Sequence, residues 1–407
     1  MNVRRSAAVL AAVAVIGAAT PAAADATPSP APSTALPSAL YGDSDPQYDG
    51  VWRQSLALLA QHTAGVEPSK AAVDWLTGQQ CADGSFAPYR ADTTKACDAK
   101  TMVDTNQTSA AVQALAALGG HDDVTKKAVD WLKSAQNKDG GWGYTAGGAS
   151  DTNSTSVVIG ALAAAGEKPA EVKKDGRSPY DALLKLALPC EGDGAGAFAF
   201  QPDKKGELVA NADATAAGVL GSLGAGLVVE PGEDGTGEAS CEKAGDPGQA
   251  AANGAAYLTD ALAEDGHLTS ALAGAEDQPD YGNTADAVVA LAAQGAGEQA
   301  GKSLTWLEKN AADWAAQSGP AAYAQLIFAA HATGADPRDF GGADLVKQLG
   351  ATGPAAPEKT TEAKSDEKND KAESDSGLSV WWFVGVCLVA GIGIGFLISG
   401  RTKRQQP

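Results

Sequence analysis

The chain has 407 residues, of which 44% are hydrophobic and 20% charged, so it can build one large packed domain or two ordinary ones. Its formal net charge of −20 would repel phosphate groups, which speaks against nucleic acid and anionic membrane surfaces as partners. Aromatic residues make up only 6% of the chain, against 48 glycines. We therefore expect a core of small side chains and close helix contacts.

The N-terminus has the three parts of a secretory signal peptide within residues 1–26. Arg4 and Arg5 supply the positive charge, Ala7 to Thr20 is apolar, and small residues suited to cleavage follow. An uncleaved anchor is the alternative, but the short apolar stretch and its flanks favour cleavage. Residues 27–48 are rich in Pro, Ser and Ala, which predicts a flexible leader.

The C-terminus carries a predicted membrane anchor. Residues 378–399 are apolar and uncharged, long enough for a transmembrane helix, and begin near Trp381 and Trp382. The basic residues that follow are Arg401, Lys403 and Arg404. They predict a cytoplasmic tail at 400–407, and residues 351–377, rich in Lys, Glu and Asp, predict a disordered stalk. We therefore expect a single-pass protein of the cell membrane whose N-terminal domain lies outside.

Four of the five cysteines, Cys81, Cys97, Cys190 and Cys241, precede the predicted anchor. In an oxidising compartment four cysteines predict two disulfides, and we favour the local pairing, Cys81 with Cys97 and Cys190 with Cys241, among three connectivities. A metal site is the alternative, but no pair has C-x-x-C spacing. We expect no metal and no cofactor.

The segment between the leader and the stalk repeats itself. The phrase AVDWL occurs at Ala72–Leu76 and again at Ala128–Leu132. Each copy is followed by a Gly/Asp turn, then a polar helix start at Asp104 or Asp151, then an Ala-rich helix. Asp at such a start caps the free N–H groups of the first turn. A recurring helix–turn–helix unit of this kind predicts a modular array.

Looser copies extend the pattern over residues 49–350, giving about twelve helices that alternate between Trp/Leu-bearing and Ala-rich ones. We predict an all-α domain of six helix pairs, with the Ala-rich helices lining the inside of a ring and the Trp-bearing helices outside. An open solenoid of the same pairs is the competing architecture.

The most complete repeat, Gln136-x-x-Asp139-Gly-Gly-Trp142 followed by Asp151-Thr-Asn-Ser-Thr, resembles the QW-type repeat of the terpenoid cyclase/protein prenyltransferase superfamily. The resemblance implies an (α/α)6 toroid with a central funnel whose mouth lies at the N-terminal ends of the inner helices. The ligand-binding candidates at those ends are Asp104, Asn106, Asp151, Asn153, Asn211, Asp213, Asn283 and Asp286.

Class II cyclases of this superfamily protonate their substrate with the middle Asp of a D-x-D-D-T-A motif. The nearest match here is Asn211-Ala-Asp213-Ala-Thr215-Ala, which keeps the middle Asp but lacks two of the acids. Asp213 is therefore the catalytic candidate if the protein is an enzyme, and a helix cap is the alternative.

Other branches of the superfamily leave little trace in the sequence. None of the four histidines stands beside a cysteine, as the zinc site of a prenyltransferase would suggest. Gly295-Ala-Gly-Glu-Gln299 resembles a thioester motif but lacks the thiol. Cobalamin carriers use the same toroid with an added β domain, for which this sequence has no room before the stalk.

Two functions compete. Export, anchor, stalk and a polar cavity rim favour a binding module that holds a small ligand, cobalamin-like or isoprenoid, without catalysis. The alternative is a terpenoid cyclase or prenyltransferase acting on an isoprenoid, whose carbocation chemistry needs more aromatic walls than this composition supplies. A purely structural scaffold is a third possibility. The expected partners are a small molecule, the membrane through the anchor, and, as a candidate, a membrane transporter.

Overall fold

A computed structural model describes residues 36–231, 241–270 and 278–357. All of these except Leu36 belong to one compact unit that begins at Pro37. The predicted signal peptide, stalk, membrane anchor and tail lie outside the described residues, apart from the first few stalk positions. Within the described part of the chain, no helix has the length and apolarity needed to cross a membrane.

The described residues form thirteen α-helices, which fall into an inner and an outer set. The inner helices are α1 (Gly50–Thr63), α3 (Thr105–Leu118), α5 (Thr152–Ala164), α7 (Ala212–Leu223), α9 (Tyr281–Gln294) and α12 (Pro320–Ala332). The outer helices are α2 (Lys70–Gly78), α4 (Asp122–Ser134), α6 (Pro179–Leu186), α8 (Pro247–Leu262), α10 (Gly297–Asn310), α11 (Ala312–Ser318) and α13 (Leu345–Ala351).

Little other regular structure occurs in the described segments. A 3-10 turn, η1 (Pro169–Glu171), precedes α6. Two short strands, β1 (Leu268–Thr269) and β2 (Pro279–Asp280), pair antiparallel with Leu268 opposite Asp280, directly before α9. The domain is therefore all-α, as the sequence predicts.

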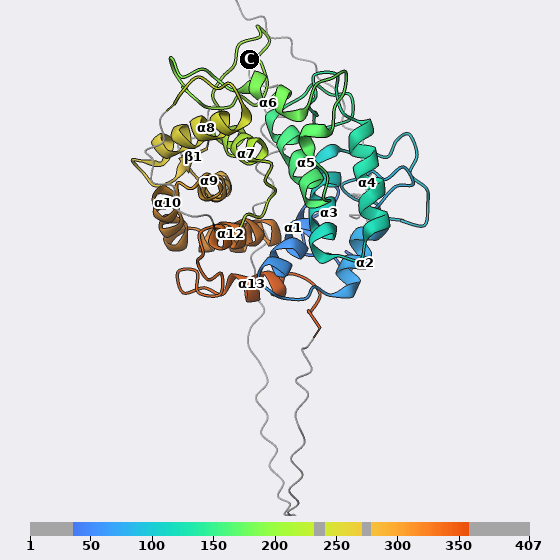
Figure 1. Ribbon diagram of the computed structural model, residues 1–407. Helices are drawn as coiled ribbons and strands as arrows, with labels where there is room; N and C mark the ends of the chain where they lie inside the picture. The colour runs from blue at the N-terminus through green and yellow to red at the C-terminus, as the bar shows by residue number, and fades with distance from the viewer. Residues whose placement is uncertain (1–35, 232–240, 271–277, 358–407) are drawn as a thin grey trace, which may run out of the picture. The chain divides into compact units, whose positions relative to one another are not determined.

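The inner helices close into a ring. Each of α1, α3, α5, α7 and α9 packs against the next inner helix, and α12 packs against both α9 and α1. Figure 1 shows these helices around the centre, with α2, α4, α8 and α10 outside them. An open solenoid would leave α12 and α1 apart, so that alternative is wrong, and the (α/α)6 toroid is confirmed.

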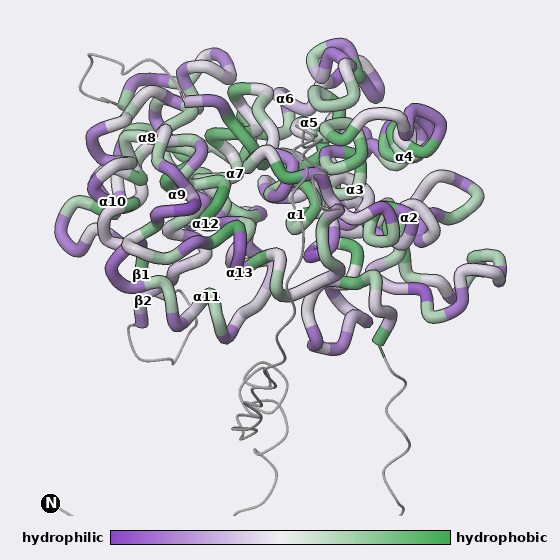
Figure 2. Tube along the Cα trace, turned by 90° about the horizontal axis from the view of Figure 1, so that it is seen from below, coloured by the Kyte–Doolittle hydropathy of each residue, from purple (hydrophilic) through white to green (hydrophobic). Residues whose placement is uncertain are grey.

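Side-chain size accounts for most inner helices, but the predicted alternation fails at two of them: α1 carries Trp52 and lies inside, and the Ala-rich α8 lies outside. The inner helices are buried around most of their circumference, as in α12, where ten residues from Pro320 to Ala332 are buried. Outer helices bury one stripe only; α4 buries Thr125, Ala128, Val129 and Leu132. A helix packed on all sides needs small apolar residues, whereas an amphipathic one suits the outside. In Figure 2 hydrophobic colour gathers on α7 and α12, and hydrophilic colour is frequent on α4.

The polar helix starts have a structural task that recurs around the ring. Asp104, Asp151 and Asn211 each accept a hydrogen bond from the backbone N–H three residues later, at 2.6–2.7 Å. A Thr four residues after each cap accepts the N–H of a buried aromatic residue in the preceding turn. These pairs are Thr108 with Phe86, Thr155 with Trp142 and Thr215 with Phe198. Cap and Thr together fix each turn on the next inner helix.

The Q-x-x-D-G-G-W turn is held from both ends. Gln136 Nε2 donates to the carbonyls of Gly140 at 2.8 Å and Val172 at 3.2 Å, and the buried Trp142 ring donates from Nε1 to Leu132 O at 2.7 Å. Gly140 has φ +96°, and a Cβ there would lie 2.1 Å from a backbone oxygen of Ser178. Only glycine fits this position, because the neighbouring chain passes too close.

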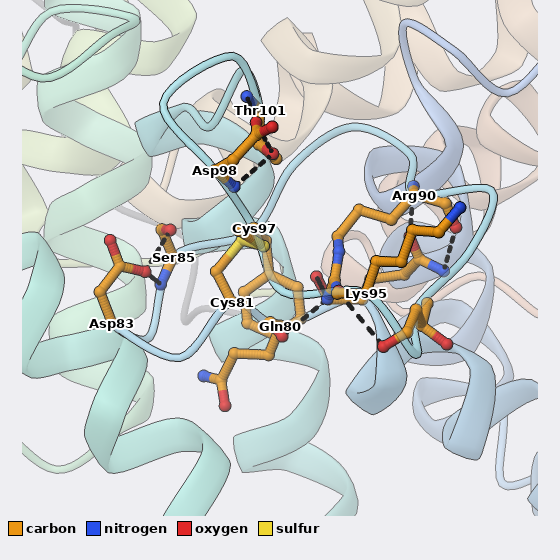
Figure 3. The surroundings of a disulfide bond; sticks show 12 residues. Gln80, Cys81, Asp83, Ser85, Arg90, Lys95, Cys97, Asp98 and Thr101 are labelled. Carbon is orange, nitrogen blue, oxygen red and sulfur yellow. Dashed lines mark hydrogen bonds between the residues drawn. A yellow bond between two sulfur atoms is a disulfide. The ribbon is translucent and has the colours of Figure 1, made fainter.

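Both predicted disulfides are confirmed. Cys81 pairs with Cys97 and Cys190 with Cys241, with Cα–Cα distances of 5.6 and 5.5 Å. Figure 3 shows the first bridge at the base of the loop that joins α2 to α3, where the Arg90 guanidinium also donates to carbonyls of the same loop, among them that of Gln80 at 2.9 Å. The second bridge joins Cys190, which follows α6, to Cys241, which precedes α8.

Candidate functional site

A cavity of about 230 Å³ occupies the centre of the ring. Its polar lining consists of Asn106, Gln113, Asn153, Ser156, Asp213, Asp286 and Gln325. Its larger apolar lining residues are Trp52, Leu56, Val157, Leu220, Leu227, Val289 and Phe328. Every inner helix contributes at least one of these side chains, so the cavity exists only when the ring is closed.

The spacing of the lining residues follows from helix geometry. Asn106, Asn153 and Asp213 each lie two residues after a helix cap, in the first turn. Asp286 and Gln325 lie six residues after their caps. Positions two, six and nine after a cap share one face of an α-helix. This face looks into the ring on helix after helix.

The eight predicted ligand-binding residues separate into two groups. Asn106, Asn153, Asp213 and Asp286 line the central cavity. Asp104, Asp151 and Asn211 do not; their side chains cap helices, and Asn283 donates through Nδ2 to Asp280 at 2.8 Å. The caps are turned to the backbone because the free N–H groups there need acceptors. Their ligand-binding role stays a prediction, and the geometry favours the first group.

Two carboxylates form the polar part of the cavity. Asp213 Oδ2 accepts from Asn153 Nδ2 at 2.9 Å, and both oxygens of Asp286 accept from Gln325 Nε2, at 3.2 and 3.0 Å. Burial raises the pKa of Asp213, and burial together with the neighbouring Asp213 and Asp280 carboxylates raises the pKa of Asp286 to about 7. Among the described residues that line the cavity, none is Lys, Arg or His.

The cavity also presents hydrogen-bond acceptors that the protein leaves unused. Asn153 Oδ1 and Ser156 Oγ are buried and have no hydrogen-bond partner within the described chain, and Ser156 is only 5% exposed. A buried polar atom without a partner is unfavourable by about 1–3 kcal/mol. A ligand that donates hydrogen bonds would relieve this penalty. The lining therefore suits a donor-bearing or positively charged group.

A segment of the chain forms the floor of the cavity. Residues 225–231, here called the strap, leave the end of α7 and run to the end of α12, where Glu230 lies 3.4 Å from His331. Within the strap, the N–H of Leu227 donates to Gln113 Oε1, and a Cβ on Gly160 would lie 2.7 Å from Gly226 Cα. Ala225, Gly226 and Leu227 of the strap line the cavity. The resemblance places the mouth at the opposite end, beside the N-terminal ends of the inner helices.

Sequence reasoning missed several lining residues. The sequence did not predict these positions as part of the site because none of them belongs to a repeated motif. They are Trp52, Gln113, Gln325, Phe328 and the strap. Their spacing could have predicted them. Gln113 and Phe328 lie nine residues after the caps of their helices, and Gln325 lies six residues after its cap, all on the face that lines the cavity. None of the four histidines, His62, His121, His267 and His331, lines the cavity as the described residues form it. No metal-binding cluster of His, Cys, Asp or Glu occurs in the described part either.

Fold and cavity together define an α/α toroid whose central cavity contains two carboxylates. Residues 52–188 match the family model described as the prenyltransferase alpha-alpha toroid domain. The match covers about a third of the chain, and within it the α/α toroid resemblance of the sequence repeats to the terpenoid cyclase/protein prenyltransferase superfamily is confirmed. No curated protein sequence matches it.

Several solved structures are similar to this chain at low identity. An ent-copalyl diphosphate synthase from Streptomyces platensis is 17% identical with a TM-score of 0.47, over 70% of this chain and 50% of that one. This chain thus spans half the length of that protein. A protein from Actinoplanes is 15% identical, with a TM-score of 0.47, over 72% and 92% of the two chains. A variant of the type II terpene cyclase MstE from Scytonema, in complex with geranylgeranyl dihydroxybenzoate, is 15% identical, with a TM-score of 0.43, over 73% and 79%.

Proposed function

We propose that this domain binds a small organic cation in its central cavity, without catalysis. The observation that carries the proposal is the partly buried pair Asp213 and Asp286 in the cavity wall, which meets no basic side chain among the lining residues. Two carboxylates in one low-dielectric cavity repel each other. A cation that enters between them replaces this repulsion with attraction.

The apolar lining supports the same ligand class. Trp52 and Phe328 lie in the cavity wall, and aromatic faces attract organic cations such as quaternary ammonium groups. A volume of about 230 Å³ is below the roughly 300–1,000 Å³ of most ligand pockets. A compact ligand or head group therefore fits better than a cobalamin-like macrocycle. An isoprenoid-like ligand fits only if most of it stays outside the cavity.

The position of the domain in the cell is part of the proposal. Two disulfides are typical of an oxidising compartment, which supports export by the signal peptide. Retention by the anchor rests on the sequence of residues 378–399. A binding module held there would pass its ligand to a membrane transporter. Protease treatment of intact cells tests the placement: the domain should be degraded while a cytoplasmic marker survives. Survival of the domain would contradict export.

Isothermal titration calorimetry with choline tests the binding function. Choline should bind the wild-type domain, and its uncharged isostere, 3,3-dimethylbutan-1-ol, should bind at least tenfold more weakly. Asp286→Asn should lose most of this preference, because it removes one carboxylate and keeps the shape. Asp260→Asn, on the outer helix α8, is the matched control. Equal affinity for choline and its isostere would contradict the proposal.

One observation favours a second function. Asp213 is the middle Asp of the nearest match to the class II cyclase motif, it lines the cavity, and burial raises its pKa, which shifts the carboxyl towards its protonated form. An acid catalyst needs that state. If the domain is a cyclase, a linear polyprenyl substrate should give a cyclic product by gas chromatography and mass spectrometry. That product should disappear in Asp213→Asn.

A further inference from the structure

The exposed apolar side chains of the domain gather at one end of the ring. Seven large apolar residues are exposed in the described segments. Five of them lie beside the N-terminal ends of inner helices, and we call them the mouth collar: Tyr48, Met102, Tyr144, Phe200 and Val209. The other two are Leu36 and Leu223. Scattered exposed apolar residues need no explanation, but a group of them beside a cavity does.

The repeat itself places two of these side chains. Tyr144 lies two residues after the buried Trp142, and Phe200 two residues after the buried Phe198. Residues two apart in an extended segment point to the same side, yet here one ring is buried and the other 47% or 45% exposed. In both repeats the turn therefore ends with an exposed aromatic ring, that of Tyr144 or that of Phe200.

Backbone hydrogen bonds fix the exposed rings next to the cavity. The N–H of Thr105 donates to Tyr144 O at 2.9 Å, and the N–H of Thr152 donates to Phe200 O at 3.0 Å. The next residue after each threonine, Asn106 or Asn153, lines the central cavity. Tyr144 and Phe200 are therefore attached through their backbone to the helix starts whose next residues line the cavity.

The remaining collar residues extend the same surface. Met102 and Val209 each lie two residues before a helix cap and are 76% and 64% exposed. Tyr48 is held through its carbonyl, which accepts from Gln107 Nε2 at 3.2 Å. Tyr48, Met102 and Tyr144 line one shallow hollow of about 650 Å³ beside the start of α3, together with charged residues of the loop between α2 and α3. The three collar side chains in this hollow give an extended apolar group a surface outside the cavity.

We propose that the ligand is a cationic amphiphile, whose ammonium group enters the central cavity and whose apolar chain lies on the mouth collar. The proposal rests on the proposed function, because it uses the same carboxylates for the head group. Charge selects the occupant: a neutral lipid would leave Asp213 and Asp286 uncompensated. Size selects it too, since a cavity of about 230 Å³ holds a head group and leaves a longer chain outside.

Alkyltrimethylammonium ions of increasing length, all below their micelle-forming concentrations, test the two parts separately by calorimetry. Tetramethylammonium reports on the cavity alone. Lengthening one chain from methyl to octyl should increase affinity by on the order of twofold per methylene, as expected for partial burial of each group. The double variant Tyr144→Ser/Phe200→Ser should bind tetramethylammonium like wild type and lose most of the gain with chain length.

Leu223→Ser removes an equally exposed apolar side chain at the other end of α7 and is the matched control; it should keep the full gain. Thermal melting of each variant checks the fold. If tetramethylammonium binds but chain length has no effect, or if the collar variant keeps the effect, the amphiphile proposal is overturned while the cation site stands. If octyl glucoside binds as tightly as octyltrimethylammonium, the collar acts without the cavity and the proposal is overturned. If no ammonium ion binds, the proposed function fails, and this inference with it.

Discussion

The backbone N–H of Leu227 donates a hydrogen bond of 2.8 Å to Oε1 of Gln113, 114 residues earlier in the sequence. The Gln113 side chain also donates from Nε2 to the carbonyl of Val157 at 3.3 Å. This one side chain on α3 therefore links α5 to the strap. Gln113 is only 4% exposed. One buried side chain therefore connects the strap at the floor of the cavity to two inner helices.

Replacement of Gln113 by Leu should loosen this floor. The Leu227 N–H would lose its acceptor, and an unpaired buried donor destabilises a protein by about 1–3 kcal/mol. Hydrogen exchange, followed by mass spectrometry, should become faster in peptides that cover residues 225–229, and thermal stability should fall. Gln348→Leu, at an exposed position on α13, should change neither. Unchanged exchange in the Gln113 variant would show that the strap is held by its apolar contacts alone.

Stability should depend on pH through Asp286. Because its folded pKa of about 7 lies above the ordinary value of 3.8, the folded state binds this proton more tightly than the unfolded state. Its contribution to stability is therefore fullest below about pH 4 and is lost as pH rises towards and through 7. Asp286→Asn removes this loss. Measured by denaturant unfolding, the variant should be more stable than wild type by up to about 4 kcal/mol at pH 8 and little different at pH 4. An equal effect at both pH values would contradict the raised pKa.

Cation binding should release a proton. A cation between Asp213 and Asp286 favours their ionised forms, whereas the raised pKa of Asp286 keeps part of the empty protein protonated at neutral pH. Choline affinity should thus increase from pH 5 to pH 8. Calorimetry at pH 6.5 in two buffers of different ionisation enthalpy should give different apparent heats. Identical heats would mean that no proton leaves on binding.

Capping and ligand contact can be separated by comparing Asp104 with Asp213. Asp104→Asn should keep the cap, since Asn also accepts the N–H of Gln107, and should leave choline affinity unchanged. Asp104→Ala should be less stable by about 0.5–2 kcal/mol. Asp213→Asn should leave the fold intact and weaken choline binding. If Asp104→Asn weakens binding as much as Asp213→Asn does, the division of the rim into caps and lining residues is wrong.

Removal of the Cys190–Cys241 bridge should destabilise the domain more than removal of the Cys81–Cys97 bridge. A bridge restricts the unfolded chain more when it closes a longer loop, and the sequence separations are 51 and 16. Each loss should lower the unfolding free energy by roughly 2–5 kcal/mol, with a difference of about 1 kcal/mol between them. Double Cys→Ser variants measured by denaturant unfolding provide the test. Intact mass before and after reduction and alkylation should show four thiols released from the domain.

The sequence predicted the fold because the fold repeats. The same three signals mark the boundary in successive modules: AVDWL, the Gly/Asp turn and the polar helix start. Each has a local cause. AVDWL supplies the apolar stripe of an outer helix, the turn needs glycine where two chains touch, and the polar residue caps free N–H groups. The disulfide pairing followed from the compartment and the spacing of Cys81, Cys97, Cys190 and Cys241. These are short-range relationships, and a single sequence displays them.

The site was predicted only in part because it is assembled from single positions far apart. A polar residue at a helix start has the same appearance in the sequence in two different cases. Its side chain can cap the backbone, as that of Asp151 does, or face the cavity, as that of Asn153 does. The two differ only in their phase on the helix. The strap was missed for another reason: Gly226 and Leu227 follow a helix end without any motif. Only the closed ring brings Gln113 within reach of them.

The closure of the ring by α12 against α1 has a consequence for how the chain reaches its folded state. Gly42 donates to the carbonyl of Thr352 at 2.8 Å, so the first and last turns of the domain are joined as well. Newly made chain emerges from its N-terminus, and α1 cannot bury its α12-facing side until about 270 further residues have followed it. A solenoid could complete each module in turn, whereas here one face of the first module must wait for the last. We expect the α1 surface to need protection by a chaperone during export, and deletion of any one helix pair to abolish folding instead of yielding a smaller ring.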